Sequence, residues 1–224
     1  MELFPDKFSK RKAAGIQKHL AEKVITTKDF KEITTVTGAD VAYANDLAAA
    51  AFVTLRLPDL SPVDRICVIT RPGISYIPGY LAFREGPPLV DAYSHMATTP
   101  ELIVFDGHGV SHPAGAGLAT HMGIFFNTPS IGCAKEHLCG DYTEPPGRRG
   151  SFSRITIEGK PVGAAVRTRE GVKPIFVSTG HRIDLETAIE YILFLTPSFR
   201  IPEPVRRAHM LAEKSLADYL ARKE

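Results

Sequence analysis

The sequence predicts a single-domain α/β protein in which a three-strand antiparallel meander and parallel strands form one mixed sheet flanked by helices. Two observations lead to this fold class. β-Favouring runs separated by short turns occupy residues 34–70. An apolar run at 102–105 ends abruptly at Asp106, as a strand buried on both faces does, and helical and short β-like segments alternate after it.

The first predicted element is an amphipathic helix at about residues 4–23. Phe8, Ala13, Ile16 and Leu20 recur near helical spacing, and the other positions are rich in Lys and Arg. A helix with one apolar face buries that face against another element. We therefore expect this helix to pack on the surface of a single domain that comprises residues 1–224.

The next elements alternate between strands and helices. A helix is expected to begin at 80–83, to be interrupted at 84–88 by Gly and two Pro, and to resume at 89–97. Asp184 is expected to cap a helix, and Pro202 to lie in the first turn of the last helix, which ends near 222. The other predicted elements are strands at 34–43, 48–57, 65–70, 130–134, 152–157, 162–167 and 175–178, and a helix at 116–126.

This order of elements matches a ribonuclease H-like core, in which the first strand lies beside the fourth. The fourth strand is the apolar run at 102–105. If the first and fourth strands are neighbours, Asp40 in the first and Asp106 after the fourth stand side by side at the centre of the sheet. The topology therefore predicts a pair of carboxylates there.

Composition excludes several classes of protein. The chain has 224 residues, three cysteines without metal-ligand spacing and a formal net charge of +2, which suits a reducing, cytoplasmic compartment. The first twelve residues are charged and lack the apolar core of a signal peptide. No apolar run approaches the roughly 20 residues that span a bilayer. We expect a monomer without a membrane partner.

The charge is unevenly distributed along the chain. Residues 1–31 carry eight Lys and Arg against four Asp and Glu, and residues 148–173 carry seven against two. Residues 79–127 carry one Arg against four acidic residues. An acidic centre between basic flanks suits a metal-dependent enzyme that acts on a polyanion, although solvated surface charge alone would give the same pattern.

Asp106 and Asp40 are the first candidates for chemistry. Open α/β sheets place ligands at the carboxyl ends of their strands, where Asp106 lies, and a buried carboxylate is costly unless it is paired or bound to a metal. The alternative for Asp106 is a simple Asp-Gly turn. Asp40 lies within a predicted strand, where Asp is disfavoured, and this favours a functional role.

Glu85, Lys135 and His209 are the further candidates. Glu85 would otherwise be surface charge near the Gly-Pro-Pro sequence. Lys135 follows a predicted apolar strand and would otherwise be an ordinary surface lysine. His209 borders the apolar stripe of the last helix, and a buried structural histidine is the alternative. Together these residues could converge at one edge of the sheet.

Carboxylates, a lysine and a histidine at one site point to phosphodiester hydrolysis. Oxygen-rich ligands favour Mg²⁺ or Mn²⁺ over zinc, and such ions hold a phosphate and activate water. Acyl transfer is disfavoured because no Ser or Cys lies in a nucleophile motif. Nucleotide-binding phosphate loops and dinucleotide fingerprints are also absent from the sequence.

Seven short strings in the sequence match one known family in the family's own order. They are GADVAY (38–43), SYIPGYLAFREGP (75–87), DGHGVSHP (106–113), GLATHMG (117–123), IGCAK (131–135), GHRIDLETA (180–188) and PEPVRRAH (202–209). Through them the chain resembles the endonuclease V family of deoxyinosine-specific repair nucleases. The resemblance implies a ribonuclease H-like fold and a divalent metal, Mg²⁺ with Mn²⁺ as a substitute. It also implies cleavage of the second phosphodiester bond 3′ to a deaminated base, leaving 3′-hydroxyl and 5′-phosphate ends.

The resemblance also implies roles for individual residues. Asp40, Asp106 and Glu85 match the family's metal-binding acidic residues, and His209 and Lys135 match residues near the scissile phosphate. Tyr76 matches an aromatic wedge, which would fill the gap left by an extruded base. The residues that match the pocket for hypoxanthine are Gly79, Leu81, Gly107, Gly109 and Gly132.

Two departures from the family pattern stand out. Ser75 replaces the proline that usually begins the wedge loop, and Ala114 replaces an arginine that commonly follows His-Pro. Both changes point to weaker DNA binding rather than to loss of activity. The main alternative substrate is inosine-containing RNA. A second alternative is a non-catalytic module that only binds deaminated bases.

Overall fold

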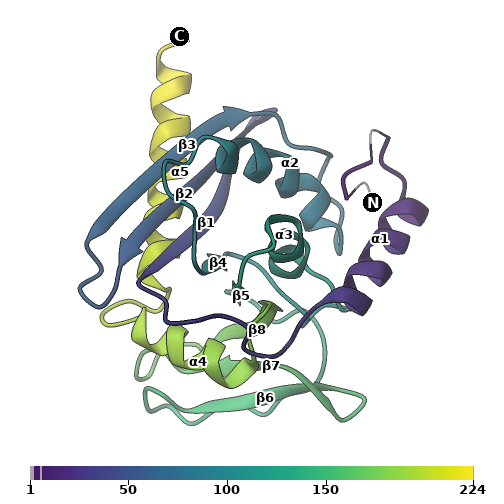
Figure 1. Cartoon of the computed structure of the whole chain (residues 1–224), viewed down its shortest axis with the longest axis vertical. Helices are drawn as coiled ribbons and strands as arrows, with labels where there is room; N and C mark the ends of the chain where they lie inside the picture. Colours follow the sequence, from purple (N-terminus) through teal and green to yellow (C-terminus); the bar gives the residue numbers. More distant parts are fainter. Residues whose placement is uncertain (1–2, 6, 224) are drawn as a thin grey trace.

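The computed structural model of the chain describes residues 3–5 and 7–223. Within these residues, eight strands form one sheet in the order β3-β2-β1-β4-β5-β8-β7-β6, and helices lie on both faces of it (Figure 1). The elements in chain order are α1 (Lys10–Lys23), β1 (Thr35–Ala44), β2 (Leu47–Arg56), β3 (Pro62–Thr70), α2 (Leu81–Ser94), β4 (Ile103–Phe105), α3 (Leu118–Phe126), β5 (Ser130–Ala134), β6 (Phe152–Ile157), β7 (Lys160–Val166), β8 (Ile175–His181), α4 (Leu185–Phe194) and α5 (Glu203–Ala221).

The sheet has the predicted mixed, ribonuclease H-like arrangement. β1, β2 and β3 form an antiparallel meander, whereas β1, β4 and β5 run parallel. In the β1–β4 register, Ala39 lies opposite Phe105. The next residues along these neighbouring strands are Asp40 and Asp106, so the register brings the two carboxylates to the same region of the sheet. The predicted adjacency of the first and fourth strands is confirmed.

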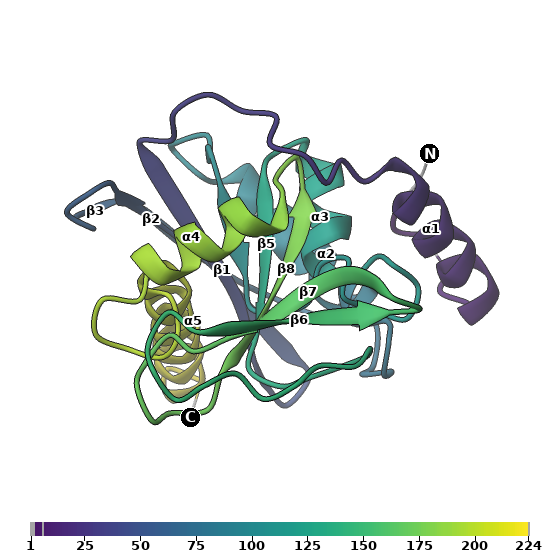
Figure 2. The ribbon, with the colours of Figure 1, turned by 90° about the horizontal axis from the view of Figure 1, so that it is seen from below.

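Strand β2, next to the edge strand β3, is buried on both faces of the sheet. The even-numbered residues from Ala48 to Phe52 pack in the core beneath α2 and α3, and the odd-numbered residues from Ala49 to Leu55 pack against α5. Four consecutive alanines let helices approach from both sides. α4 lies across β7 and β8, and α1 lies at the side of the molecule away from β3 (Figure 2).

α5 rests directly on β1 at Gly38. A Cβ atom at this glycine would lie 2.1 Å from the carbonyl carbon of Pro204, so no larger residue fits without moving the helix. Side chains two residues apart on a strand face the same side of the sheet. Asp40 therefore faces α5 as Gly38 does, and the close packing at Gly38 places His209, one turn further along α5, over Asp40.

The predicted interruption of the second helix at 84–88 is wrong, because α2 is continuous. Pro88 has no N–H to donate to the carbonyl of Arg84, four residues earlier. The backbone N–H of Gly73 donates to that carbonyl instead, at 2.9 Å. The preceding loop therefore satisfies the acceptor that proline leaves open, and the same hydrogen bond fastens this loop to the helix.

The predicted start of the first helix at about residue 4 is also wrong. Ser9 is the N-cap of α1, and its hydroxyl accepts a hydrogen bond from the backbone N–H of Lys12. Phe4 precedes the helix and stacks on His121 of α3, with ring centroids 4.8 Å apart. Phe4 thus anchors the segment before the helix to the core.

The other predicted elements are present with boundaries that shift by up to about three residues. The Asp184 cap is confirmed, because its carboxylate accepts from the backbone N–H of Thr187 at 2.8 Å.

Among the described residues, no helix combines the length and apolarity needed to cross a membrane.

Candidate active site

Three acidic side chains from separate elements meet in one pocket of about 460 Å³, which we call the acidic pocket. Asp40 comes from β1, Glu85 from α2 and Asp106 from the residue after β4. Their exposed fractions are 10%, 8% and 16%, too small for the surface turn or surface charge that the sequence allowed. The pocket is lined by Asp40, Val41, Tyr43, Tyr76, Leu81, Arg84, Glu85, Asp106, Lys135 and His209.

Burial and the neighbouring negative charges oppose ionisation of Asp40 and Glu85. Burial raises the pKa of Asp40, and the neighbouring charge of Asp106 raises it further. The pKa of Glu85 is raised well above its usual value by burial, with added contributions from Asp40 and Asp106. Because the charges of neighbouring carboxylates disfavour ionisation of Asp40 and Glu85, the site gains from binding a cation.

His209 and Lys135 supply hydrogen bonds to two of the carboxylates. The Nδ1 atom of His209 lies 2.6 Å from Oδ2 of Asp40, and its Nε2 atom lies 3.3 Å from Oε1 of Glu213. The ammonium of Lys135 donates to Oδ2 of Asp106 at 2.5 Å. Burial lowers the pKa of Lys135, but the adjacent Asp106 outweighs this effect, and the net shift is upward.

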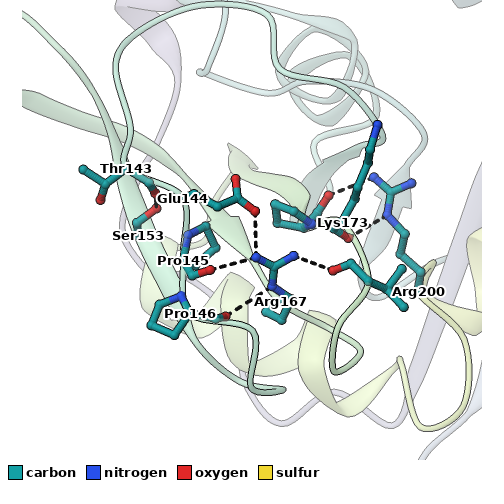
Figure 3. A network of polar contacts seen from close by, with 10 residues as sticks. Thr143, Glu144, Pro145, Pro146, Ser153, Arg167, Lys173 and Arg200 are labelled. Carbon is teal, nitrogen blue, oxygen red and sulfur yellow. Dashed lines mark hydrogen bonds and ion pairs between the residues drawn. The ribbon is translucent and has the colours of Figure 1, made fainter.

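Arg200 fixes the backbone that carries Lys135. Its guanidinium donates to the carbonyls of Lys135 and Pro174, each at 2.8 Å, and to that of Lys173 at 3.0 Å. The carbonyl of Arg200 accepts from the hydroxyl of Thr168 at 2.7 Å. Figure 3 shows this arginine beside Lys173. The segment before α5 and the end of β5 are thus held together close to the acidic pocket.

The loop between β5 and β6 is held in place by Arg167, a buried arginine that directly follows β7 (Figure 3). The guanidinium of Arg167 donates to the carbonyl of Pro145 at 2.7 Å, to that of Pro146 at 3.2 Å and to the carboxylate of Glu144 at 2.6 Å. These contacts satisfy a buried charge and hold a Gly-, Pro- and Arg-rich loop in one conformation.

The acidic pocket has the ligands of a hard cation, although they are not already gathered around one point. Carboxylate oxygens suit Mg²⁺ and Mn²⁺. In residues 3–5 and 7–223, no group of three or more His, Cys, Asp or Glu side chains is arranged to hold a metal ion. Magnesium commonly uses one or two carboxylates together with waters and substrate phosphates, so Asp40 and Asp106 with Glu85 nearby fit such an ion.

Tyr76 lies on a loop at the rim of the acidic pocket. Its side chain is 65% exposed, so it does not pack into the core. The loop is fastened to α2, because the guanidinium of Arg84 donates to the carbonyl of Ile74 at 2.9 Å. The guanidinium of Arg84 also lies 4.1 Å from the centre of the Tyr43 ring. An exposed aromatic ring is thus held on an anchored loop.

A second hollow of about 220 Å³, which we call the side pocket, adjoins the acidic pocket. Tyr76 and Leu81 line both hollows. The lining residues of the side pocket are Gln17, Tyr76, Gly79, Leu81, Ala82, His108, His112, Gly117, Leu118, Glu136, His137 and Leu138.

The five residues matched to a base pocket fall into two groups. Gly79 and Leu81 line the side pocket. Gly107, Gly109 and Gly132 pack against one another behind it. A Cβ atom at Gly132 would lie 2.4 Å from the nitrogen of Gly109 and 2.7 Å from the carbonyl oxygen of Gly107. These three glycines let the β4–α3 loop lie close to β5.

Comparison with known proteins identifies the family. A family model described as endonuclease V matches residues 18–210, which is most of the chain. The chain belongs to the endonuclease V family. It is 44% identical over 201 residues to endonuclease V from Dictyoglomus thermophilum, and the match covers 90% of this chain and 88% of that protein.

Solved structures of endonuclease V support the same assignment. The enzyme from Streptomyces avermitilis superposes with a TM-score of 0.91 at 38% identity, and the match covers 97% of this chain and 98% of that one. Endonuclease V from Ciona intestinalis, in complex with a 24mer DNA containing an inosine followed by a ribo-adenosine, superposes with a TM-score of 0.81 at 27% identity. That match covers 93% of this chain and 98% of the Ciona chain.

Sequence reasoning did not single out several residues that line the two hollows of this endonuclease V. Arg84 precedes Glu85 in the FRE sequence, but it was assigned to a break in the helix. Gln17 is a buried amide on the first helix, where a polar residue on the apolar face was the available signal. His112 follows Asp106 closely in sequence, and three nearby histidines gave no basis for choosing one of them.

Glu85→Gln is expected to melt at a higher temperature than the parent protein at neutral pH in chelator. Because the folded pKa of Glu85 lies above the unfolded value of 4.5, the stability linked to its protonation is fully present below pH 4.5. That stability is lost as pH rises through the folded pKa. The advantage of the variant should therefore shrink toward pH 4.5, as measured by thermal unfolding at several pH values.

The exposed residue Glu190 on α4 provides the control, because Glu190→Gln should show no such pH-dependent difference. A Glu85→Gln advantage that stays constant with pH, or grows in acid, would contradict the assignment of Glu85 as a buried, charge-destabilised carboxyl group.

Proposed function

We propose that this chain is a metal-dependent endonuclease that cleaves DNA at the second phosphodiester bond 3′ to deoxyinosine, leaving 3′-hydroxyl and 5′-phosphate ends. The observation that carries the proposal is the shared rim of the two hollows. An acidic pocket suited to phosphate chemistry and a side pocket adjoin, with Tyr76 lining both. The proposal includes a monomer in the cytoplasm, in keeping with cysteines that form no disulfide.

Asp40, Asp106 and Glu85 are the residues proposed to hold Mg²⁺, for which Mn²⁺ would substitute. When bound, the ion supplies Lewis-acid polarisation of phosphate oxygens and lowers the pKa of water. The raised pKa values of Asp40 and Glu85 support this role, because a cation would relieve the repulsion that raises them.

His209 and Lys135 are proposed to act on the phosphate and the attacking water. His209 orients the Asp40 carboxylate through Nδ1, while Nε2 faces the exposed carboxylate of Glu213. A ring held in this way can pass a proton between the pocket and solvent. Lys135 balances the charge of Asp106, and its ammonium is placed to stabilise negative charge that develops on a phosphate oxygen.

The side pocket is proposed to receive the extruded base. Gly79 and Leu81 line this pocket, and Leu81 also lines the acidic pocket. Gly107, Gly109 and Gly132 would support the same pocket from behind, where their lack of side chains lets the backbone approach. Hypoxanthine differs from adenine by an acceptor at position 6 and a donor at position 1, which backbone groups can distinguish.

Cleavage of matched strands tests this function. Otherwise identical duplexes with deoxyinosine or adenine at one position should be incubated with Mg²⁺, Mn²⁺ or chelator, and the product ends mapped. We expect a single cut at the second bond 3′ to deoxyinosine and none with adenine or chelator. Equal cleavage of the adenine duplex, or cleavage in chelator, would refute the proposal.

Inosine-containing RNA is the second candidate substrate. The DNA bound by the Ciona enzyme carries a ribo-adenosine directly after the inosine, so a ribonucleotide is accepted next to the base in that relative. The same assay with matched DNA and RNA strands separates the two candidates by their relative kcat/KM. A non-catalytic binding module is disfavoured, because all three carboxylates line one pocket.

Tyr76→Ala is expected to weaken binding to deoxyinosine duplex by about 5- to 150-fold, because stacking of an aromatic ring on a base contributes ~1–3 kcal/mol. Tyr76→Phe should retain most of the affinity. Since the ring is 65% exposed, the thermal stability of both variants should match the parent's. Fluorescence anisotropy with duplex and single-stranded DNA measures the effect, which should be smaller on single strands.

The wedge role is wrong if Tyr76→Ala binds the deoxyinosine duplex as tightly as the parent protein does. It is also wrong if Tyr76→Ala unfolds the protein, since that outcome would make Tyr76 a packing residue.

A further inference from the structure

The buried side chain of Gln17, on α1, lines the side pocket. Gln17 lies on α1, which covers the edge of the domain (Figure 2), yet only 3% of its surface is exposed. Its Nε2 atom donates to the carbonyl of Gly79 at 2.8 Å and to the carbonyl of Ala116 at 3.4 Å. Both partners only accept hydrogen bonds, so the NH₂ group of the amide must face them.

The two carbonyls belong to different walls of the side pocket. Gly79 ends the loop that carries Tyr76, whereas Ala116 precedes Gly117, where the other wall enters α3. Gln17 itself lines the same hollow. The amide group of Gln17 thus connects the Gly79 loop to the Ala116 segment, and its two N–H groups hold them at a defined distance.

His112 and Gly79 both line the side pocket. Its Nδ1 atom accepts from the backbone N–H of Ala114 at 3.1 Å. The ring proton of the neutral imidazole is therefore on Nε2. Gly79 has φ +81°, a conformation that favours glycine. Gln17 therefore donates to the carbonyl of a residue whose backbone conformation favours glycine.

We propose that Gln17 is a positioning residue for base recognition, which holds the Gly79 and Ala116 walls of the side pocket at the spacing that accepts a deaminated purine. This inference rests on the proposed function. Gln17 does not line the acidic pocket, so its loss should reduce discrimination between bases while the cleavage chemistry remains.

Gln17→Met tests the proposal, because methionine has a similar length and volume but donates no hydrogen bond. Dissociation constants should be measured for a deoxyinosine duplex and for the same duplex with adenine. Loss of the amide contacts is expected to lower the ratio of specific to non-specific affinity about three- to tenfold, with adenine-duplex binding unchanged. Gln17→Asn keeps the amide but shortens its reach, and should lower the ratio similarly.

Glu22→Met is the matched control, because Glu22 is exposed on the same helix and should keep the parent ratio. An unchanged ratio in both Gln17 variants would overturn the proposal. A parallel loss of affinity for both duplexes would do so too, since it would indicate a general structural role.

A double-mutant cycle adds a second readout. A Cβ atom at Gly79 would meet no other atom within 4 Å, so Gly79→Ala acts through backbone conformation rather than through a clash. If Gln17 works through Gly79, the losses in the ratio caused by Gln17→Met and Gly79→Ala should be non-additive in the double variant. Additive losses would contradict the proposal.

Measurements on the parent protein distinguish a failure of the inference about Gln17 from a failure of the proposed function. If the parent prefers deoxyinosine duplex and Gln17→Met preserves that preference, the inference about Gln17 fails while the proposed function stands. A parent that binds and cleaves both duplexes equally would refute both.

Discussion

Asp106→Ala is expected to abolish Mg²⁺-dependent cleavage of deoxyinosine DNA while the protein stays folded. Asp106 lies at the carboxyl end of β4, beside Asp40 across the β1–β4 register, and its removal takes one of two central carboxylates from the proposed metal site. Its loss also relieves the repulsion that raises the pKa of Asp40 and Glu85, so metal-free stability should not collapse. Single-turnover cleavage and thermal unfolding measure the two effects.

Asp218→Ala is the matched control for this prediction. Asp218 is exposed on α5, so this variant should cleave like the parent. Asp106→Asn keeps the size of the side chain and removes its charge, and we expect it to be as inactive as Asp106→Ala. Near-normal Mg²⁺-dependent activity in either Asp106 variant would exclude Asp106 from the metal site.

The central part of the fold could be predicted because its sequence signals are local and strong. The strand-like runs separated by short turns predicted the meander, and the apolar run before Asp106 predicted β4. From these elements the topology alone predicted that Asp40 and Asp106 stand on neighbouring strands, which the register confirms. Glu85, Lys135 and His209 were also named, and the structure brings all three to the same pocket.

The errors arose where tertiary contacts override local preference. Pro87 and Pro88 normally end a helix, but the N–H of Gly73 donates to the carbonyl of Arg84, and α2 continues. Nothing within 81–94 encodes that donor, which comes from the preceding loop. The first helix was likewise predicted to begin too early, because Ser9 caps it and Phe4 stacks on His121 before it starts.

Hydrogen bonds between residues far apart in the sequence also could not be predicted from local patterns. The amide of Gln17 meets a carbonyl 62 residues away in sequence, and Arg200 meets the carbonyl of Lys135 across 65 residues. Both donors are ordinary polar residues in their own segments. Their partners are backbone groups, which every residue offers, so no residue type marks the contact. Only the folded arrangement assigns them to the walls and supports of the site.

His209→Ala is expected to lower the cleavage rate by about two to four orders of magnitude, the range for loss of a group that transfers a proton. The helix that carries His209 is held close to β1 by Gly38, and the ring lies 2.6 Å from the Asp40 carboxylate. With both ring nitrogens beside carboxylates, the imidazole is placed to orient water and exchange protons. Single-turnover cleavage rates of the parent and the variant at saturating Mg²⁺ measure the loss.

Calorimetric titration with Mg²⁺ separates this role from metal ligation. If His209 acts in proton transfer, His209→Ala should bind Mg²⁺ with nearly the parent affinity. Glu213→Gln removes the exposed charge 3.3 Å from Nε2, so it should alter the rate much less than His209→Ala does. A His209→Ala variant that loses Mg²⁺ affinity would make His209 a ligand, and one that cleaves at the parent rate would leave it no role in the reaction. Because Asp40 contacts His209 and its pKa is raised by the charge of Asp106, either result would also show which effects depend on the histidine and which on the carboxylates.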